Sequence, residues 1–481
     1  MFPIPTACFS LLIGLAPLSP AAPPPERHEN PSHRVAATRV ERENVLLIVI
    51  DTLRPDHMGC YGYDRQTTPN IDRLAARSLV FDNAYASSSW TRTSVASLLT
   101  GLDPYRHGVF SEGGEESILY PSAVSLAEVL RENGYRTAGI SGNPHVSRES
   151  GFDQGFDSFL SIGKWPQENN TREVAEAALR SLRGLDPAQG NFLYIHFLDP
   201  HDPWVSPEDC GSFLAGLSVR QPAVLAGNAY VLSGEFEIEQ ELSSGRLPRA
   251  RELSAEELDY LRGLYDCEIS LVDREIGRIM KYLEQARWSE RTIVILCSDH
   301  GEEFGEHGML RHGYQLFGET VRVPLVLYLP GRDVAGRRSE AVELVDVAPT
   351  VLSLVGLSGE TEGLDGVVLP GVRTPQAARR EAPTAFGVTR FRKRNHAYVV
   401  SGTMKLIWDF QAGAGKLYDL GADPREREPR EPVESPWGRK LLPRLERWMV
   451  EGLAAALPRD ATAGEMDEET KQLLRALGYV E

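Results

Sequence analysis

Acidic and imidazole side chains follow two apolar runs of this sequence, at the point where each run ends. Asp51 comes directly after the run at 44–50, and Asp299 and His300 follow the run at 292–296. Because ligands of open parallel sheets bind beyond the carboxyl ends of the strands, we expect these side chains to meet at one edge of a sheet. Two carboxylates and an imidazole are ligand types that a divalent cation accepts. Taken singly, each residue could instead cap a helix or belong to a buried ion pair.

The apolar runs predict the strands that must position these groups. Residues 44–50 (NVLLIVI) are continuously apolar and β-branched, which is typical of a strand buried on both faces of a parallel sheet. Helical patterns lie between the strands, at 124–132 and after Ser254, where Ser-Ala-Glu-Glu predicts a capping box. This alternation predicts an α/β fold. Further strands are predicted at 136–140, 191–197, 292–296 and 324–329.

The pattern changes after about residue 372. Short strands separated by glycine-containing turns are predicted at 397–401, 405–410 and 417–420, and they indicate a small antiparallel sheet. An arginine- and proline-rich segment and a terminal helix ending in LLRALGYVE complete the chain. The sequence therefore predicts an α/β domain over 44–372 and a small-sheet subdomain with a terminal helix over 373–481.

The N-terminal segment has the composition of an export signal. Residues 7–18 are apolar but too few to span a bilayer, and small residues follow them at a suitable cleavage point. We therefore expect a signal peptide over 1–22, a proline-rich linker over 23–43 and export to the periplasm or the extracellular space. No lysine or arginine precedes the apolar core. The alternative is an ordinary flexible N-terminus.

Composition excludes several classes of partner. The chain has 481 residues, with 51 Lys plus Arg against 68 Asp plus Glu, and its net charge of −17 repels nucleic acid and anionic membranes. We expect no nucleic-acid partner and no integral membrane segment. The five cysteines form no CxxC pair, so neither a disulfide framework nor a cysteine-rich zinc site is expected. An anionic substrate would need local cations to hold it.

Seven segments of the chain form an ordered series. They are VIDTLRPDHMGCYGY at 49–63, SWTRTSVASLLTG at 89–101 followed by LDPYRHG, FLDPHDPW at 197–204, SDHGEEFGEHG at 298–308, RVPLVLYLPG from 322, VDVAPTVLSLVG from 345 and LYDL at 417–420. This series resembles the sulfatases of the alkaline phosphatase superfamily. The resemblance implies an α/β/α sandwich around a large mixed sheet, with a small C-terminal antiparallel sheet. Residues 44–372 would then be the catalytic domain.

The resemblance also implies a metal site. By position, Asp51, Asp299 and His300 would hold one divalent metal ion, which could be Ca, Mg or Mn. Relatives often carry a second acidic residue directly after the first, and this sequence has Thr52 there. With Thr52 in place of an acid, the resemblance does not imply a preference for calcium.

The nucleophile position departs from the sulfatase pattern. Sulfatases place a Cys or Ser ten residues before the Gly of a Thr-Gly pair, within C/S-x-P-x-R, and convert it to formylglycine. Counting back from Gly101 gives Thr91, with Thr93 and Val95 in the Pro and Arg positions. A secondary alcohol cannot give the aldehyde, so we expect Thr91 to attack directly as a metal-activated alkoxide, as in the phosphodiesterase branch of the superfamily.

Two alternatives to a nucleophilic Thr91 stay open. Ser88, with Arg92 four residues later, gives a competing register, although it breaks the spacing to the Thr-Gly pair. Thr91 could also serve only as the N-cap of a helix that runs to Leu99. A group at a helix N-terminus also feels the helix dipole, which favours an anion there, so capping and catalysis are compatible.

Several further side chains are implied to contact the substrate. His201 and His312 stand where relatives place an imidazole and a cation near the bound anion, and both are predicted to be catalytic. Arg54 is predicted to bind substrate, although it could pair with Asp56 instead. The segment at 203–253 is expected to form a rim that sets specificity. The remaining substrate-binding candidates are Asn143 and His196.

Three functions fit these features. The first is a metal-dependent hydrolase of small, glycan or lipid anionic esters, either sulfate or phosphate and phosphonate esters, with Thr91 as nucleophile. The second is a catalytically silent protein that binds an anion in the same pocket. The third is a transferase that moves a phospho-headgroup to an acceptor alcohol through a covalent Thr91 intermediate.

Overall fold

The computed structural model describes residues 42–112, 115–163, 170–204, 210–217, 253–373, 383–391 and 394–458. The predicted signal peptide (1–22), nearly all of the linker (23–43) and the predicted terminal helix lie outside the described residues, as does most of the rim segment. Among the helices of the described part, none combines the length and the apolar character that a membrane span requires.

A nine-stranded mixed sheet forms the centre of the described fold. Strand β1 (Asn44–Ile50) pairs in parallel with β7 (Asn191–Phe197) on one side and with β8 (Thr292–Cys297) on the other. The strand order is β11-β2-β12-β8-β1-β7-β5-β6, with β13 also paired to β2. The remaining strands are β2 (Leu79–Tyr85), β5 (Arg136–Ser141), β6 (Ser158–Ser161), β11 (Arg322–Val323), β12 (Leu325–Tyr328) and β13 (Gly336–Glu343).

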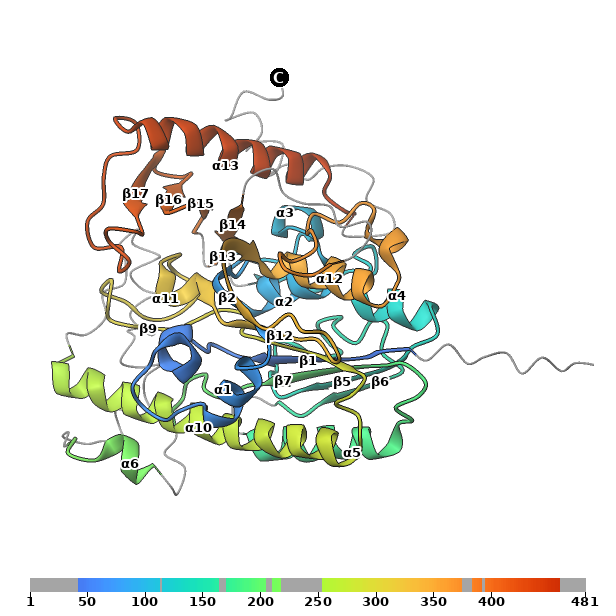
Figure 1. Ribbon diagram of the computed structural model, residues 1–481. Helices are drawn as coiled ribbons and strands as arrows, with labels where there is room; N and C mark the ends of the chain where they lie inside the picture. Colours follow the sequence, from blue (N-terminus) through green and yellow to red (C-terminus); the bar gives the residue numbers. More distant parts are fainter. Residues whose placement is uncertain are drawn as a thin grey trace, which may run out of the picture. The chain divides into compact units, whose positions relative to one another are not determined.

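Helices cover both faces of this sheet (Figure 1). Every residue of β1 is buried: Val45, Leu47 and Val49 belong to one hydrophobic core, and the alternate residues belong to the other. This is the burial on both faces that the sequence predicted. On the first face lie α2 (Thr91–Thr100), α4 (Leu126–Glu132) and α12 (Val347–Leu354); on the second lie α1 (Pro69–Ala75), α5 (Thr171–Gly184) and α10 (Ala255–Gln285).

A four-stranded antiparallel sheet follows the large one in the chain. It runs in the order β14 (Thr384–Thr389), β15 (His396–Ser401), β16 (Met404–Asp409) and β17 (Ala414–Asp419), and α13 (Pro436–Ala454) packs against it. Tyr105 and Phe110 of the larger region belong to the same hydrophobic core as this sheet. The predicted α/β/α sandwich with a small antiparallel sheet is confirmed, whereas the boundary at 372/373 stays a prediction.

Short elements complete the described part. Helices α3 (Pro104–His107), α6 (Gly211–Leu214) and α11 (Gly318–Val321) have four residues each. The hairpin strands are β3 (Ser111–Glu112) with β4 (Glu115–Glu116) and β9 (Glu303–Phe304) with β10 (Leu310–Arg311). Single 3₁₀ turns span Pro55–His57, Gly59–Tyr61, Leu344–Asp346 and Ser358–Thr361.

The long helix α10 begins as the sequence predicts. The Ser254 side chain accepts a hydrogen bond from the Glu257 amide, and the Glu257 carboxylate accepts one from the Ser254 amide. This reciprocal arrangement satisfies two amide groups that the first turn of a helix would otherwise leave open. Helix α10 can therefore start sharply and run for 31 residues under the sheet.

A disulfide joins Cys210 to Cys267 in α10. The sequence predicts no disulfide framework; it did not predict this single bond, which does not by itself make one. The two residues are 57 positions apart and form no spacing motif, so the sequence gives no signal for their pairing.

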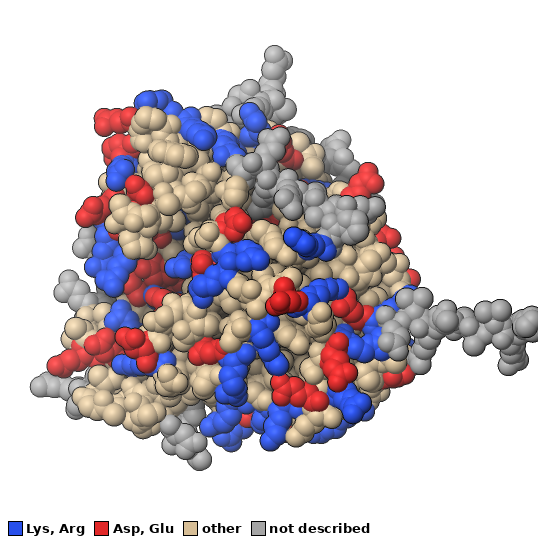
Figure 2. Space-filling model, viewed as in Figure 1, with Lys and Arg blue, Asp and Glu red and all other residues tan. Residues whose placement is uncertain are grey.

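Acidic and basic side chains are interspersed over the face of the molecule drawn in Figure 2. The net charge of −17 is therefore not expressed as one continuous acidic surface on this face.

His107 makes stability depend on pH. It is 2% exposed, and its Nδ1 accepts a hydrogen bond from the Val109 amide at 3.0 Å, so the ring proton lies on Nε2, 3.0 Å from Ser97 Oγ. Burial lowers the His107 pKa to about 3. The unfolded chain takes up this proton near pH 6.5, so the free energy of unfolding falls as the pH drops from about 6.5 toward 3.

We predict that His107→Gln reduces this acid slope by about one proton, roughly 1.4 kcal/mol per pH unit, because glutamine does not titrate. Urea denaturation of wild type and variant at several pH values between 4 and 7 measures the difference. Parallel curves for the two proteins would contradict the prediction.

Candidate active site

Three ligand groups meet at the carboxyl end of the central strands. Asp51 follows β1, Asp299 follows β8 after one residue, and His196 lies in β7 opposite Val49. One ligand atom from each of Asp51, His196 and Asp299 lies within 4.8 Å of the others, and all three side chains are fully buried. The parallel pairing of β1 with both neighbours produces this convergence.

Each of the two carboxylates has one oxygen in a hydrogen bond and one oxygen free of such bonds. Asp51 Oδ2 accepts a hydrogen bond from Asn143 Nδ2, and Asp299 Oδ1 accepts one from the His300 amide at 3.0 Å. The second oxygens, Asp51 Oδ1 and Asp299 Oδ2, are buried with no hydrogen-bond partner among the described residues. Burial, together with the charge of Asp299, raises the pKa of Asp51 well above its usual range.

His196 has the same arrangement as the carboxylates. Its Nδ1 lies 2.9 Å from the hydroxyl of Tyr194, two residues earlier on the same strand, and its Nε2 is buried with no hydrogen-bond partner in the described part of the chain. Burial lowers the His196 pKa to about 4, so the ring is neutral, as a metal ligand must be. The sequence predicts His196 as a substrate-binding residue; in the structure it lies in the candidate metal group, and a substrate contact by it stays a prediction.

The donor set fits a divalent cation. An isolated buried carboxylate costs several kcal/mol unless it is paired or coordinated, and here the free oxygens of Asp51 and Asp299 and the free nitrogen of His196 converge. Oxygen donors with one imidazole suit Ca²⁺, Mg²⁺ or Mn²⁺. The contact from Tyr194 to His196 is typical of the second hydrogen bond that orients a ligating imidazole.

Thr91 and His300 lie beside this group, and the predicted role of His300 as a metal ligand stays a prediction. Thr91 is the first residue of α2, is 1% exposed and has its Oγ1 3.1 Å from His300 Nε2. The same nitrogen is 3.4 Å from Asp299 Oδ2 and 3.7 Å from Asp51 Oδ1. His300 Nδ1 lies 3.1 Å from the Gly301 carbonyl oxygen, which can only accept, so Nδ1 carries the proton and Nε2 accepts from Thr91.

The structure can be compared with the two alternatives for Thr91, a helix N-cap and the competing Ser88 register. The N-cap of α2 is Trp90, and no side-chain cap hydrogen bond occurs there among the described residues, so Thr91 does not cap the helix. Ser88 is also buried, at 1% exposure. Arg92, its partner in the competing register, donates from Nε to the His145 carbonyl at 3.2 Å.

His312 and His201 form an imidazole cluster with His300. The His312 ring centroid lies 4.4 Å from that of His300 and 4.8 Å from that of His201. His312 Nδ1 is 3.0 Å from Glu302 Oε1, and His201 Nδ1 is 2.5 Å from the Asp202 carbonyl oxygen. Burial lowers the pKa of His201 to about 4 and that of His312 well below its usual range. The sequence analysis placed both residues near the site, and the structure puts them there; their catalytic roles stay predictions.

Two predicted substrate-binding residues have protein partners. Arg54 is 5% exposed and forms a two-pronged pair with Asp56, with N···O distances of 2.9 and 2.7 Å, as well as a 2.9 Å contact with Glu306. The pairing with Asp56 that the sequence left open is therefore the arrangement present. Asn143 holds Asp51 Oδ2 and accepts from the His145 amide at 2.7 Å. A direct substrate contact by either residue stays a prediction.

Sequence reasoning missed two residues around the site, Tyr194 and Glu302, and the strained backbone of a third, Thr52. Tyr194 could have been found, because residues two apart on a strand share a face. Glu302 could not, because its contact with His312 depends on how the loop after β8 returns. Thr52 has a φ of 56°, an outlier for a β-branched residue, and its hydroxyl is buried without a hydrogen-bond partner in the region that the structure describes. Backbone strain of this kind gathers at functional sites.

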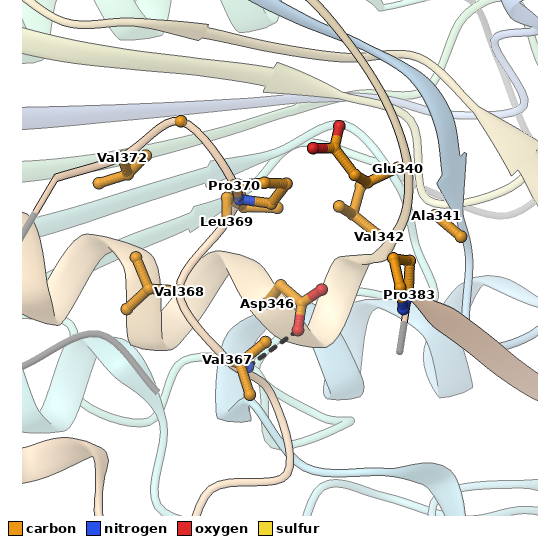
Figure 3. Close-up of a pocket in the computed structure, with 11 residues that line it drawn as sticks. Glu340, Ala341, Val342, Asp346, Val367, Val368, Leu369, Pro370, Val372 and Pro383 are labelled. Carbon is orange, nitrogen blue, oxygen red and sulfur yellow. Dashed lines mark hydrogen bonds between the residues drawn. The ribbon is translucent and has the colours of Figure 1, made fainter. Parts of the chain in front are cut away.

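A separate cavity of about 270 Å³ lies near α12 and is drawn in Figure 3. The residues that line it include none of the predicted site residues. Of its two acidic residues, Glu340 is exposed, and Asp346 already accepts backbone hydrogen bonds from Val367 and Glu343, both at 2.9 Å. These contacts explain the Asp346 carboxylate without a ligand.

The chain matches known proteins over most of its length. The family model described as Sulfatase matches residues 43–357. An arylsulfatase of Clostridium perfringens is 25% identical over 445 residues, covering 80% of this chain and 89% of that protein. The phosphonate monoester hydrolase of Agrobacterium radiobacter has a TM-score of 0.65 at 21% identity, covering 89% and 99% of the two chains. A protein solved with its substrate D-glucosamine-2-N,6-O-disulfate has a TM-score of 0.66 at 22% identity, covering 87% and 100%.

These matches identify the protein at two levels. As a class, it is an enzyme that hydrolyses ester bonds. In particular, the chain belongs to the sulfatase family, because the family match covers more than half of its length. The predicted resemblance to sulfatases and the predicted hydrolase class are confirmed at this level. The two solved structures show the shared fold.

The candidate metal site makes a prediction about stability. In the presence of chelator, Asp51→Asn removes one of two facing buried carboxylates and is expected to unfold at a higher temperature than wild type. With Mn²⁺ at a hundredfold excess over its Kd, wild type gains about 3 kcal/mol, and the variant loses most of this gain. Thermal unfolding with chelator and with Mn²⁺ measures both effects.

Asp333→Asn is the matched control, because Asp333 is exposed and is not one of the candidate ligands. It is expected to show the wild-type response to Mn²⁺. An equal Mn²⁺ shift in wild type and Asp51→Asn would contradict the site.

Proposed function

We propose that this protein is a divalent-metal-dependent hydrolase of anionic esters in which Thr91 is the nucleophile. One observation carries the proposal: Thr91 Oγ1 lies 3.1 Å from His300 Nε2, and that nitrogen lies within 3.7 Å of carboxylate oxygens of Asp51 and Asp299. A hydroxyl, a base and a cation site therefore occupy one buried spot. This is the group of parts that nucleophilic transfer requires.

In this proposal Asp51, His196 and Asp299 hold one divalent ion, Ca²⁺, Mg²⁺ or Mn²⁺, with His300 at the edge of the site. A bound cation supplies positive charge that lowers the pKa of a nearby hydroxyl and offsets the charge of the transferred group. The two carboxylates and one imidazole, with Thr52 where relatives often have a further acid, make a site of modest negative charge. This composition supports Mg²⁺ or Mn²⁺ as readily as Ca²⁺.

The protein's own groups account for the proton transfers. His300 Nε2 accepts the Thr91 proton as Oγ1 forms a bond to the phosphorus or sulfur atom and the bond to the leaving ester oxygen breaks. His300 gives this proton to the leaving oxygen, which departs as an alcohol. Water then gives a proton to His300 and attacks the same atom; the bond to Thr91 Oγ1 breaks, the anion is released, and His300 returns the proton to Oγ1. The first turn of α2 favours an anion beside Thr91. The charge of a bound anion would favour protonated His201 and His312 rings, which can donate to its oxygens.

The threonine guides the choice of substrate. Sulfatases that use formylglycine need a Cys or Ser at this position, and Thr91 cannot be converted. Direct attack by a hydroxyl supports a phosphate or phosphonate ester, and the similarity in fold to a phosphonate monoester hydrolase agrees with that choice. The family match supports a sulfate ester instead. We propose small, glycan or lipid phosphate or phosphonate esters as the first class to assay, with sulfate esters as the second.

We also propose export, to the periplasm or the extracellular space. The disulfide between Cys210 and Cys267 supports it, because such bonds persist mainly in oxidising compartments. The apolar segment at 7–18 supports it independently.

The nucleophile is tested with aryl sulfate, aryl phosphate, bis-aryl phosphate and aryl phosphonate, each with and without chelator. We expect turnover of at least one ester, its loss with chelator, and a decrease of more than about 100-fold in kcat for Thr91→Ala. Thr100→Ala, which loses a hydroxyl at the other end of α2 and whose Oγ1 binds the Ala96 carbonyl, is the matched control and is expected to keep wild-type activity.

Other outcomes of this assay would favour the alternative nucleophile or the alternative functions. Full activity in Thr91→Ala with loss in Ser88→Ala would move the nucleophile to the competing register. No turnover of any ester by wild type would favour the anion-binding protein. A new ester formed with an added alcohol, in place of hydrolysis, would favour the transferase.

A further inference from the structure

A small aromatic cluster lies against the active-site histidines. Met309, Tyr314 and Phe391 are buried together, and the partly buried Trp90 packs against them. The Trp90 ring lies 4.4 Å from Phe391, 5.1 Å from His145 and 5.8 Å from His312 between centroids. This cluster is distinct from the two cores that flank the large sheet.

Helix capping does not explain the identity of Trp90. It occupies the N-cap of α2, where Ser, Thr, Asn and Asp are favoured because their side chains bind the first amides, and its side chain makes no such bond among the described residues. Core packing explains it only in part, since its three apolar neighbours are at least nine-tenths buried whereas Trp90 keeps exposed surface. Trp90 therefore keeps some exposed surface directly before Thr91 in the chain.

The small C-terminal sheet supports this aromatic cluster. Phe391 lies just after strand β14. Two hydrogen bonds hold β14 to the larger region. The Val388 amide donates to the Ser87 carbonyl at 2.9 Å, and Thr389 Oγ1 donates to the Gly313 carbonyl at 2.5 Å. Ser87 lies just before Trp90, and Gly313 just after His312. Strand β14 thus bonds to the segments on both sides of the cluster, and Phe391 packs against the Trp90 ring at an interplanar angle of 34°.

We propose that Trp90 forms a subsite for a ring in the alcohol part of the ester, and that Phe391 is a positioning residue for it. The inference rests on the proposed function, because it deepens the substrate class of the same site. The face of an indole packs on an aryl ring or on the C–H face of a pyranose, and such contacts add to the affinity of a neighbouring anion. The substrate class is then an aryl or a sugar ester, as opposed to a small alkyl ester.

Binding tests this subsite without relying on turnover. Calorimetric titration of Mn²⁺-loaded protein with phenylphosphonate and with methylphosphonate compares one anion with and without a ring. We expect phenylphosphonate to bind about tenfold more tightly to wild type, the scale of an aromatic stacking contact, and Trp90→Leu to lose that preference while keeping its affinity for methylphosphonate within twofold. Trp437→Leu, which alters an exposed tryptophan of α13, is the matched control and should behave as wild type.

Kinetics provide a second arm, with phenyl, glucose-6-yl, choline and methyl esters of the anion that wild type hydrolyses. Trp90→Leu should raise KM about tenfold for the phenyl and glucose esters and leave methyl ester kcat/KM within twofold; Phe391→Leu should do the same to a smaller degree. Selective loss of the phenyl ester would assign an aryl substrate, and selective loss of the glucose ester a glycan.

Three results would overturn the subsite: equal loss on ring-bearing and methyl ligands, no loss on any of them, or a loss confined to the choline ester. If Trp90→Leu fails to fold, Trp90→Phe replaces it, because phenylalanine keeps an aromatic ring. This variant should retain at least half of the wild-type difference in log Kd between phenylphosphonate and methylphosphonate. Complete loss of that difference would count against stacking. Failure of Thr91 as nucleophile would appear as active Thr91→Ala with the ring preference intact, so the two proposals fail separately.

Discussion

The site depends on one constraint: two buried carboxylates face each other at the ends of parallel strands. Asp51 and Asp299 are fully buried, and each keeps one oxygen without a hydrogen bond in the part of the chain that the structure describes. Like charges at this spacing destabilise the fold unless positive charge lies between them. His300 could supply at most one such charge, and its Nε2 is already within hydrogen-bonding distance of Thr91. In the proposed function, a divalent cation would balance the pair and leave His300 Nε2 free to accept a proton.

The large sheet, helix α2 and the small C-terminal sheet each position residues at or beside the candidate site. The large sheet aligns β1, β7 and β8 so that their carboxyl ends meet. Helix α2 packs on one face and begins at Thr91, so its first turn lies beside the cation site. The small sheet reaches the site through β14 and Phe391. The C-terminal region thus contacts the segments that flank the site, and under the proposed subsite we expect specificity to depend on both regions.

The sequence predicted the elements that burial alone determines. Strands β1, β7 and β8 are apolar along their whole length, so their ends, and with them Asp51 and Asp299, could be located. The sequence analysis missed strand β13, because its first five residues are exposed or half-exposed and it has no continuous apolar run. The place of His196 in the candidate metal group could not be predicted, since it depends on the register that sets His196 opposite Val49. The pairing of Cys210 with Cys267 likewise depends on tertiary approach.

The central claim is that one cation lies between Asp51, His196 and Asp299. Anomalous diffraction from crystals soaked in Mn²⁺, with data collected on both sides of the manganese absorption edge, tests it most directly. The account predicts a single strong peak within coordination distance of both free carboxylate oxygens and of His196 Nε2, with Thr91 beside it. A fully soaked crystal with no peak at this position, or with manganese bound only elsewhere, would contradict the account.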